Sequence, residues 1–380
     1  MLLKKMNANN YTKSSLKECV EYIEQCKKGQ VSDEGPLVEG EKEESFKISD
    51  ESMFEIPKCQ EFRRLGFVDG GTAVILRSSD FSISFTRVAG VVIENNETTT
   101  LKKTPEVIEY YSATVLEPTP DNSLQYTTRL FPLEVQYERF LPDKEISIPI
   151  DEVRTSRGLL PNIETFGGII MRFAEWAYGT KFLETELNEG DIYVRDGSLQ
   201  TGFKDEILQT RELYSTAKDK NVYVTGLSKS CRLITKTGDS LITLINLIGN
   251  QKFPNTTWYY HPIYRITKAD NQADVHFVKL HKLSDYPFRF DIYIEQSKNL
   301  DTKEKEIIMG NLAANSDDLS FPGYPYGLIK ADQMAKVGQA EIEPLKIQLL
   351  SEFNAAHYNK FIRPRVRSVD AHDLLNILRR

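Results

Sequence analysis

The stretch DIYVRDGSLQTG, residues 191–202, joins a short apolar strand to a charged end and a glycine-marked turn. Asp196 is followed directly by Gly197, and Asp-Gly after a strand is a strong turn signal, because glycine accepts the positive φ of tight turns. A carboxylate at the end of a strand is also a typical ligand of hard divalent cations. Asp196 is therefore either a turn former or a metal ligand, and the second interpretation requires further acidic residues elsewhere in the chain.

Strand patterns lie on both sides of this stretch. The segments RLGFVDGGTAVILRSS (64–79) and FSISFTRVAGVVIEN (81–95) predict strands joined as hairpins, which indicates an antiparallel part of a sheet. From Pro161 the pattern becomes helical, and a second helix is predicted at 204–220 after the strand. Hairpins followed by alternating strands and helices predict an α/β fold, in which helices flank a mixed β-sheet.

The two ends of the chain differ in character from its centre. Residues 11–28 predict an amphipathic helix, and residues 29–52 are rich in charged and small residues, which is typical of a solvated linker. We therefore expect three parts. These are an N-terminal helix and charged linker at 1–60, a central domain at 61–337 and a helical, Arg-rich tail at 338–380.

The overall composition argues against several classes of protein. Hydrophobic residues make up 40% of the 380 residues and the net charge is −7, which indicates a globular protein rather than one that coats nucleic acid by charge alone. An acidic balance is compatible with an enzyme whose carboxylates hold cations. The chain shows no apolar run as long as a membrane span, no secretory signal and no P-loop. We therefore expect a cytoplasmic protein without membrane contact and without an ATP motor of its own.

Three aspartates end or interrupt apolar strands: Asp69 in GFVDGG, Asp196 in YVRDGS and Asp291 in FRFDIY. Phosphodiester hydrolysis commonly uses such groups, because cations held by shared carboxylates activate a water, orient the scissile phosphate and stabilise the leaving oxygen. Strands hold the carboxylates rigidly, and an adjacent glycine lets a phosphate backbone approach closely.

Glu175 is a fourth acidic candidate, on the helix that is predicted after Pro161. It lies with Met171, Tyr178 and Phe182 on an apolar flank of that helix. A charged side chain in such a place must be paired, exposed or bound to a metal ion. The simpler alternative is a glutamate at the edge of the core that reaches solvent.

Several short blocks occur in an order that resembles the NurA nuclease family: FVDGG (67–71), RFAEW (172–176), VRDGSL (194–199), GLSKSC (226–231), HFVKL (276–280), FRFD (288–291) and GYPYGLIKAD (323–332). Each block alone is weak, whereas their order and spacing between residues 61 and 335 are together fairly specific. The resemblance implies a ribonuclease-H-like fold, a homodimer, and acidic residues that bind manganese, with magnesium as the alternative cation. It also implies DNA as the substrate and docking to a hexameric HerA-type translocase.

The same resemblance implies which acidic residues bind the metal. Asp69, Glu175 and Asp196 match the metal-binding acidic positions of the family, and Asp291 matches its later aspartate. The first block departs from the family pattern, because it has Asp-Gly-Gly where the family often has Asp-Gly-Ser. The segments before residue 61 and after residue 337 match poorly, so the resemblance does not support partner docking there.

The resemblance adds a tyrosine and a lysine to the expected catalytic site. The family tyrosine that precedes the later aspartate points to Tyr260 in WYYHPI, with Tyr259 as its rival. Lys229 in GLSKSC matches a lysine of the family pattern and is expected to contact a phosphate. The aromatic run WYYHPIY could also stack on unpaired bases, although aromatic residues in a strand more often belong to the core.

Taken together, these features predict a metal-dependent deoxyribonuclease, acting as an exonuclease or single-strand endonuclease in DNA end processing with a HerA-type translocase. The runner-up is a catalytically silent subunit that guides DNA for such a translocase. The acidic set discriminates between the two, because a silent subunit would have no need to retain it. A third interpretation is a glycosidase with two catalytic carboxylates, whose activity would survive chelation of metal ions.

Overall fold

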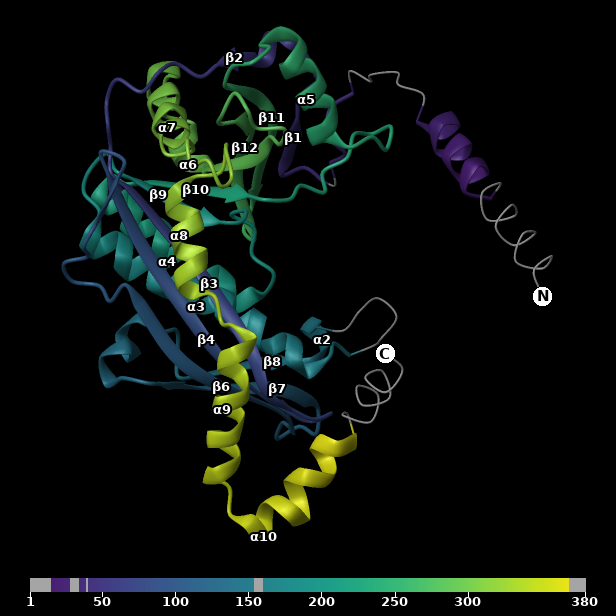
Figure 1. Ribbon diagram of the computed structural model, residues 1–380, viewed down its shortest axis with the longest axis vertical. Coiled ribbons are helices and arrows are strands. Elements are labelled where there is room, and N and C mark those ends of the chain that lie inside the picture. The colour runs from purple at the N-terminus through teal and green to yellow at the C-terminus, as the bar shows by residue number, and fades with distance from the viewer. Residues whose placement is uncertain (1–14, 28–33, 39, 154–159, 369–380) are drawn as a thin grey trace, which may run out of the picture.

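The computed structural model describes residues 15–27, 34–38, 40–153 and 160–368, which are arranged around one large sheet (Figure 1). The strands are β1 (Glu43–Ser45), β2 (Met53–Glu55), β3 (Leu65–Arg77), β4 (Phe81–Glu94), β5 (Glu97–Thr99), β6 (Val107–Pro118), β7 (Leu124–Pro132), β8 (Glu145–Pro149), β9 (Ile192–Asp196), β10 (Tyr223–Ser228), β11 (Trp258–Lys268), β12 (Asn271–Lys279) and β13 (Phe288–Tyr293). The α-helices are α2 (Ile150–Val153), α3 (Phe166–Glu186), α4 (Lys204–Lys220), α5 (Leu241–Lys252), α6 (Ile294–Ser297), α7 (Thr302–Ala314), α8 (Tyr326–Ala335), α9 (Gln339–Glu352) and α10 (Ala355–His357). Short 3-10 or π turns are η1 (Asp50–Ser52), η2 (Val135–Phe140), η3 (Ile163–Thr165) and η4 (Tyr358–Ile362), and a further helix spans 15–26. In the part of the chain that the structure describes, no helix combines the length and the apolar character needed to cross a membrane.

The described strands form one sheet of thirteen, in the order β1-β11-β12-β13-β10-β9-β3-β4-β6-β7-β8, with β2 beside β11 and β5 beside β4. β3, β4 and β6 are antiparallel neighbours, whereas β9 runs parallel to β3 and β10 runs parallel to β9. Three antiparallel strands followed by two parallel ones are the central order of a ribonuclease-H-like sheet. The predicted α/β fold, a mixed sheet flanked by helices, is confirmed.

The parallel pair β3 and β9 decides which side chains meet. Its last paired residues are Val68 and Arg195, so Asp69 and Asp196 follow directly where this pairing ends. β9 stops at Asp196, whereas β3 continues beside β4 to Arg77. The carboxyl ends of neighbouring parallel strands lie at one edge of the sheet, where ligands of α/β proteins commonly bind. Strand register alone therefore brings together two aspartates that are far apart in the sequence.

Helices cover both faces of β3 and β4. α3 packs on one face, with α4 against α3, and α8 packs on the other; in Figure 1 α8 lies in front of the sheet and α3 behind it. Successive side chains of β3 point to opposite faces, so Val68 joins the core on the α3 side and Phe67 joins the core on the α8 side. Burial on both faces explains why the central strands are nearly continuous apolar runs up to Asp69 and Asp196.

The charged N-terminal segment differs from the predicted linker. β1 and β2 lie in or next to it, and both pair antiparallel with β11. Without them β11 would be a sheet edge with unpaired backbone groups, and backbone pairing does not require apolar side chains. The helix at 15–26 agrees with the prediction, but Leu16, Val20 and Ile23 on its apolar face are more than half exposed. Residues 11–14 of the predicted helix lie outside the described residues.

The described part of the C-terminal tail is helical, as predicted, and two ion pairs connect it to the sheet region. Glu341 of α9 lies 2.7 Å from Arg87 of β4, and Arg365 lies 3.0 Å from Asp80 before β4. One of the tail arginines is therefore held by a carboxylate of this chain. Residues 369–380 of the predicted tail lie outside the described residues.

Two glycines provide a matched test of how closely α8 packs on the sheet. A Cβ at Gly327 of α8 would lie 2.1 Å from the buried ring of Phe67, so we expect Gly327→Ala to lower the free energy of unfolding by about 1–3 kcal/mol. A Cβ at Gly168 of α3 would meet no atom within 4 Å, so Gly168→Ala should raise it by up to about 1 kcal/mol. Urea unfolding followed by circular dichroism measures both changes, and equal effects would contradict this packing.

Candidate metal centre

A group of three carboxylates lies where the pairing of β3 with β9 ends. Asp69 of β3, Asp196 of β9 and Asp332 of α8 each offer a carboxylate oxygen, and these oxygens lie within 4.8 Å of one another. The sequence pattern predicts the first two together. It does not identify Asp332, although that residue ends the block GYPYGLIKAD. We call these three side chains the carboxylate group.

Glu175 of α3 lies beside the carboxylate group. It is 6% exposed, and its Oε2 accepts a hydrogen bond from Nη2 of Arg195 at 2.8 Å. A Cβ at Gly70 would lie 2.7 Å from Oε1 of Glu175, so the absence of a side chain at Gly70 lets Glu175 approach the strand next to Asp69. Arg195 also stacks on Trp176, with its guanidinium carbon 4.1 Å from the ring centroid. Glu175 is therefore buried and paired, not a glutamate that reaches solvent.

The close approach of the acidic side chains changes the protonation of Asp69. Burial raises the pKa of the Asp69 carboxyl to about 8, and the negative charges of Asp196 and Glu175 add to the rise. A hydrogen bond from the Gly70 N–H and the ammonium of Lys229 oppose it. Burial likewise raises the pKa of Glu175. Asp69 therefore keeps its proton at neutral pH until a positive charge takes the place of that proton.

Lys229 and Tyr324 contact Asp196 directly. Nζ of Lys229 lies 2.7 Å from Oδ2 of Asp196 and 3.3 Å from Oδ1 of Asp332, and the Tyr324 hydroxyl donates a hydrogen bond to Oδ1 of Asp196 at 3.1 Å. Burial opposes a charge on Lys229, but the carboxylate of Asp196 raises the pKa of Lys229, which stays an ammonium. Burial raises the pKa of Tyr324 as well, so its hydroxyl remains a donor. The sequence predicts Lys229 here but not Tyr324, which belongs to the same block as Asp332.

The turn and metal interpretations of Asp196 are compatible. Gly197 has a φ of +104°, in the left-handed region that favours glycine, and its N–H donates a hydrogen bond to the Leu227 carbonyl at 2.8 Å. The turn is therefore formed by Gly197. Asp196 is the last residue of β9, and its side chain is left to join the carboxylate group.

The structure does not bring Asp291 into the carboxylate group. Asp291 is fully buried in β13, and its two oxygens accept hydrogen bonds from the Arg289 guanidinium at 2.7 and 2.9 Å. Oδ2 also accepts a hydrogen bond from the Leu199 N–H at 3.1 Å. The oxygens expected to bind a metal are thus engaged by Arg289 and by the loop after β9, which Asp291 holds in place.

Neither of the two candidate tyrosines contacts the carboxylate group. Tyr260 is buried in the core and its hydroxyl accepts a hydrogen bond from the Ser49 N–H at 2.8 Å. Tyr259 stacks on Phe54, with ring centroids 5.2 Å apart. Their strand, β11, is separated from β9 by β12, β13 and β10. The aromatic run WYYHPIY therefore builds the core around β11 and does not form a surface for stacking bases.

A second group with metal-binding side chains lies on β11 and β12. His261, Asp274 and His276 each offer one such atom within 4.8 Å of the others. All three residues are buried, and both histidines form hydrogen bonds with Asp274. Nε2 of His261 lies 2.8 Å from Oδ2 of Asp274, and Nδ1 of His276 lies 3.0 Å from the backbone carbonyl of Asp274. Burial lowers the pKa of His276 to about 3, which keeps the ring neutral. A buried group of this kind offers no access to a large substrate, so the carboxylate group is the better candidate.

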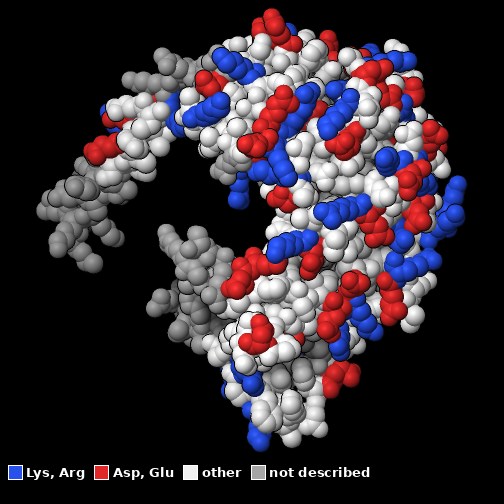
Figure 2. Space-filling model, turned by 180° about the vertical axis from the view of Figure 1, so that it is seen from behind, with Lys and Arg blue, Asp and Glu red and all other residues white. Residues whose placement is uncertain are grey.

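The carboxylate group opens into a depression of about 510 Å³, lined by Asp69, Glu175, Asp196 and the loop at 197–202. Arg172 also lines it, and its guanidinium lies 2.9 Å from a fully buried carboxylate, that of Glu206. The depression thus combines carboxylates with a fixed cation. On the face drawn in Figure 2, positive and negative side chains are interspersed over the described residues.

One protein family and several solved structures resemble this chain. The NurA nuclease from Sulfolobus solfataricus is 15% identical with a TM-score of 0.48, over 92% of this chain and 95% of that one. Endonuclease V from Ciona intestinalis, in complex with DNA, is 10% identical with a TM-score of 0.35, over 76% of this chain and 89% of that one. No curated protein matches the chain. The NurA domain matches residues 63–337, and the chain therefore belongs to the NurA family.

Proposed function

We propose that this protein is a metal-dependent deoxyribonuclease, which hydrolyses phosphodiester bonds at the ends or in single-stranded parts of DNA. Membership of the NurA family supports a nuclease. The observation that carries the proposal is the convergence of Asp69, Asp196 and Asp332 at the point where the parallel pairing of β3 and β9 ends, with Lys229 against Asp196 and Asp332. Carboxylates and a fixed ammonium at one point are the groups needed to hold a divalent cation and a phosphate.

The donor atoms of the carboxylate group fit a hard divalent cation. All three side chains offer oxygen, the ligand that manganese and magnesium prefer. Burial first, and then repulsion from the neighbouring carboxylates, raises the pKa of Asp69, and a divalent cation relieves that repulsion. We propose manganese, with magnesium as the alternative. When bound, the cation would supply a Lewis acid that polarises the scissile phosphate and makes water a better nucleophile.

The chain's own side chains would bind and orient the DNA around that cation. Asp69, Asp196 and Asp332 would hold it, and Glu175 would hold Arg195 in place beside them. The ammonium of Lys229 would neutralise charge on a phosphate oxygen. Gly197 carries no side chain next to Asp196, which leaves room for a sugar-phosphate backbone.

The proposal extends to the setting of the enzyme. The family resemblance supports a homodimer that works with a hexameric HerA-type translocase in DNA end processing, and we propose the cytoplasm as its location. The sequence itself contains no P-loop, so movement of the DNA would fall to a separate ATPase. A silent DNA-guiding subunit is less well supported, because buried carboxylates that repel one another lower stability and would serve no purpose in it.

Substitution of Asp196 tests the nuclease activity. We expect Asp196→Asn to reduce cleavage of linear DNA in manganese by about 100-fold or more, because an amide does not supply the negative charge that holds the cation. Gel analysis of end-labelled DNA measures this. Asp317→Asn, at an exposed aspartate outside the depression, is the matched control and should cleave normally.

Two outcomes would contradict the nuclease proposal. Identical background cleavage by the unaltered protein and by Asp196→Asn would show that the carboxylate group is not catalytic. Full activity in EDTA would show that the reaction needs no divalent cation, as the glycosidase interpretation predicts for its own substrate.

A second pair of variants separates Asp332 from Asp291 as a metal ligand. Asp332 is half exposed, so Asp332→Asn should change stability by less than about 0.5 kcal/mol while weakening manganese binding about 10- to 100-fold. Asp291→Asn leaves the buried Arg289 guanidinium without its counter-charge and should cost about 3 kcal/mol of stability, with manganese affinity largely kept. Calorimetric titration measures the manganese affinity, and urea unfolding measures the stability. If Asp291→Asn weakened manganese binding and Asp332→Asn did not, Asp291 would be the ligand.

The raised pKa of Asp69 predicts how metal binding depends on pH. Below about pH 8 the Asp69 carboxyl is protonated, and the cation must displace that proton. Manganese affinity should therefore rise by up to about tenfold per pH unit from pH 6 to 8 and level off above 8. Calorimetry at pH 7 in buffers of different ionisation enthalpy should show close to one proton released. An affinity that does not change between pH 6 and 8 would contradict the assignment of Asp69.

A further inference from the structure

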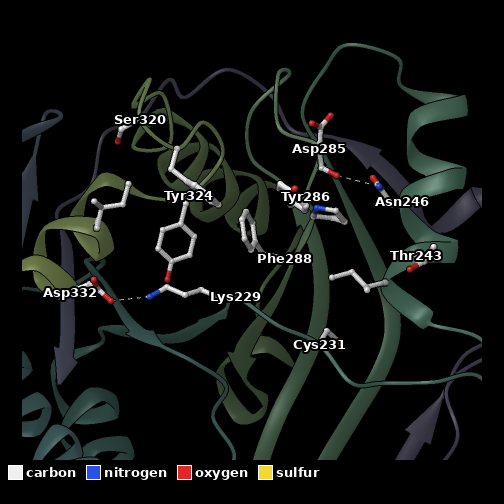
Figure 3. Close-up of a pocket in the computed structure, with 14 residues that line it drawn as sticks. Lys229, Cys231, Thr243, Asn246, Asp285, Tyr286, Phe288, Ser320, Tyr324 and Asp332 are labelled. Carbon is white, nitrogen blue, oxygen red and sulfur yellow. Dashed lines mark hydrogen bonds and ion pairs between the residues drawn. The ribbon is translucent and has the colours of Figure 1, made fainter. Parts of the chain in front are cut away.

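A second cavity opens beside the carboxylate group. Its volume is about 740 Å³, within the roughly 300–1,000 Å³ range of sites that bind small organic groups. Aromatic and aliphatic side chains dominate its lining: Ile242, Tyr286, Phe288, Phe321, Tyr324 and Ile329. Figure 3 shows Tyr324 and Lys229 on one side of this cavity and Thr243 and Asn246 of α5 on the other. We call it the aromatic cavity.

The aromatic cavity and the carboxylate group share a wall. Lys229, Tyr324 and Asp332 line the cavity, and each of them also belongs to the carboxylate group or touches it. The Tyr324 hydroxyl bonds to Asp196, and Nζ of Lys229 lies 5.3 Å from the centroid of the Tyr324 ring and 2.7 Å from Asp196. A phosphate held by Lys229 and the carboxylate group would therefore have its own nucleoside within reach of the cavity.

The chemistry of the lining selects the part of a nucleotide that fits. Phosphate and sugar are polar, and an apolar aromatic lining disfavours them. A nucleobase has an apolar face and a polar edge, and every base stacks on aromatic side chains. Asn246 of α5 can pair with a polar base edge through its amide nitrogen, which makes only a long hydrogen bond of 3.5 Å to the Asp285 carbonyl, whereas its amide oxygen already accepts a hydrogen bond from Asn250 at 3.1 Å.

We propose that the aromatic cavity binds one unstacked base of a single strand, next to the phosphodiester that the carboxylate group hydrolyses. This inference rests on the proposed nuclease function, because the scissile phosphate is what brings the base to the cavity. Tyr286 is 64% exposed and Phe321 is 46% exposed, so both aromatic faces are available to an incoming base. Bases of an intact duplex are stacked on their neighbours and do not enter, which makes a single-stranded or frayed end the preferred substrate. Every base has a face that stacks on aromatic side chains, so the cavity accepts all four bases.

Binding without metal tests the base site apart from cleavage. The probe is a single-stranded oligonucleotide with one 2-aminopurine, mixed with the full-length protein in EDTA; stacking on an aromatic ring quenches its fluorescence. We expect quenching by the unaltered protein and little quenching of the same probe in a duplex. The double variant Tyr286→Ala, Phe321→Ala should bind the single strand roughly 5- to 150-fold more weakly, with the quenching lost. Both side chains are exposed, so the fold should be kept; Phe131→Ala, at an exposed ring on β7, is the matched control.

Cleavage in manganese supplies the second readout. A single abasic position moved along the strand should lower cleavage of one adjacent bond by the unaltered protein, and the double variant should be insensitive to that position. Unchanged quenching and affinity in the double variant would overturn the base site while leaving the nuclease intact, and would assign the cavity to another occupant such as a partner protein. If the double variant lost the quenching and the unaltered protein cleaved no DNA, the base site would be supported and the nuclease function would be overturned.

Discussion

The structure depends on one constraint: the register of the adjacent parallel strands β3 and β9 forces two aspartates, Asp69 and Asp196, to lie side by side. The pairing of β3 with β9 ends at Val68 and Arg195, and neither Asp69 nor Asp196, the next residue of each strand, can move away without breaking that pairing. Burial and the resulting repulsion raise the pKa of Asp69, and a backbone N–H and an ammonium oppose this rise. The same constraint fixes the distance between the two proposed cation ligands without relying on a flexible loop, and catalytic carboxylates require rigid placement of this kind.

Buried ion pairs hold the surroundings of the carboxylate group in place. Glu175 with Arg195 lies on the α3 side of the site, and Asp291 with Arg289 lies beneath the loop that follows β9. Such pairs add little net stability, because each charge loses its hydration, but removal of one partner is costly. Their value here is geometric, since each pair has one orientation in which both charges are satisfied. Arg172 with the fully buried Glu206 repeats the pattern at the rim of the depression.

Much of the fold and part of the site could be predicted from local sequence. Hairpin signals and the helical pattern after Pro161 are properties of short segments, and they indicated the mixed sheet with helices. Aspartates at strand ends before glycine pointed to Asp69 and Asp196 for the same reason. Asp332 and Tyr324 could not be found this way, because their place depends on α8 packing on Phe67, which no local pattern encodes. The sequence placed Tyr260 wrongly, because spacing along the chain does not reveal that its strand, β11, lies several strands away from β9 in the sheet. The prediction that Asp291 joins the acidic site did not anticipate Arg289. That residue lies two positions earlier on the same face of β13, and its guanidinium donates hydrogen bonds to both oxygens of Asp291.

The contact between Lys229 and Asp196 would couple the binding of the ion to the binding of the DNA. In the structure the ammonium already neutralises the carboxylate that a divalent ion would bind. In the function proposed here, a bound divalent ion would neutralise Asp196 instead, and the ammonium of Lys229 would be free to pair with another anion. Binding of the ion should thus raise the affinity of the protein for DNA. By thermodynamic reciprocity, binding of DNA should raise the affinity for the ion by the same factor. Before the ion and DNA bind, Lys229 therefore supplies the positive charge that the ion would supply, and the carboxylate of Asp196 is not left unpaired.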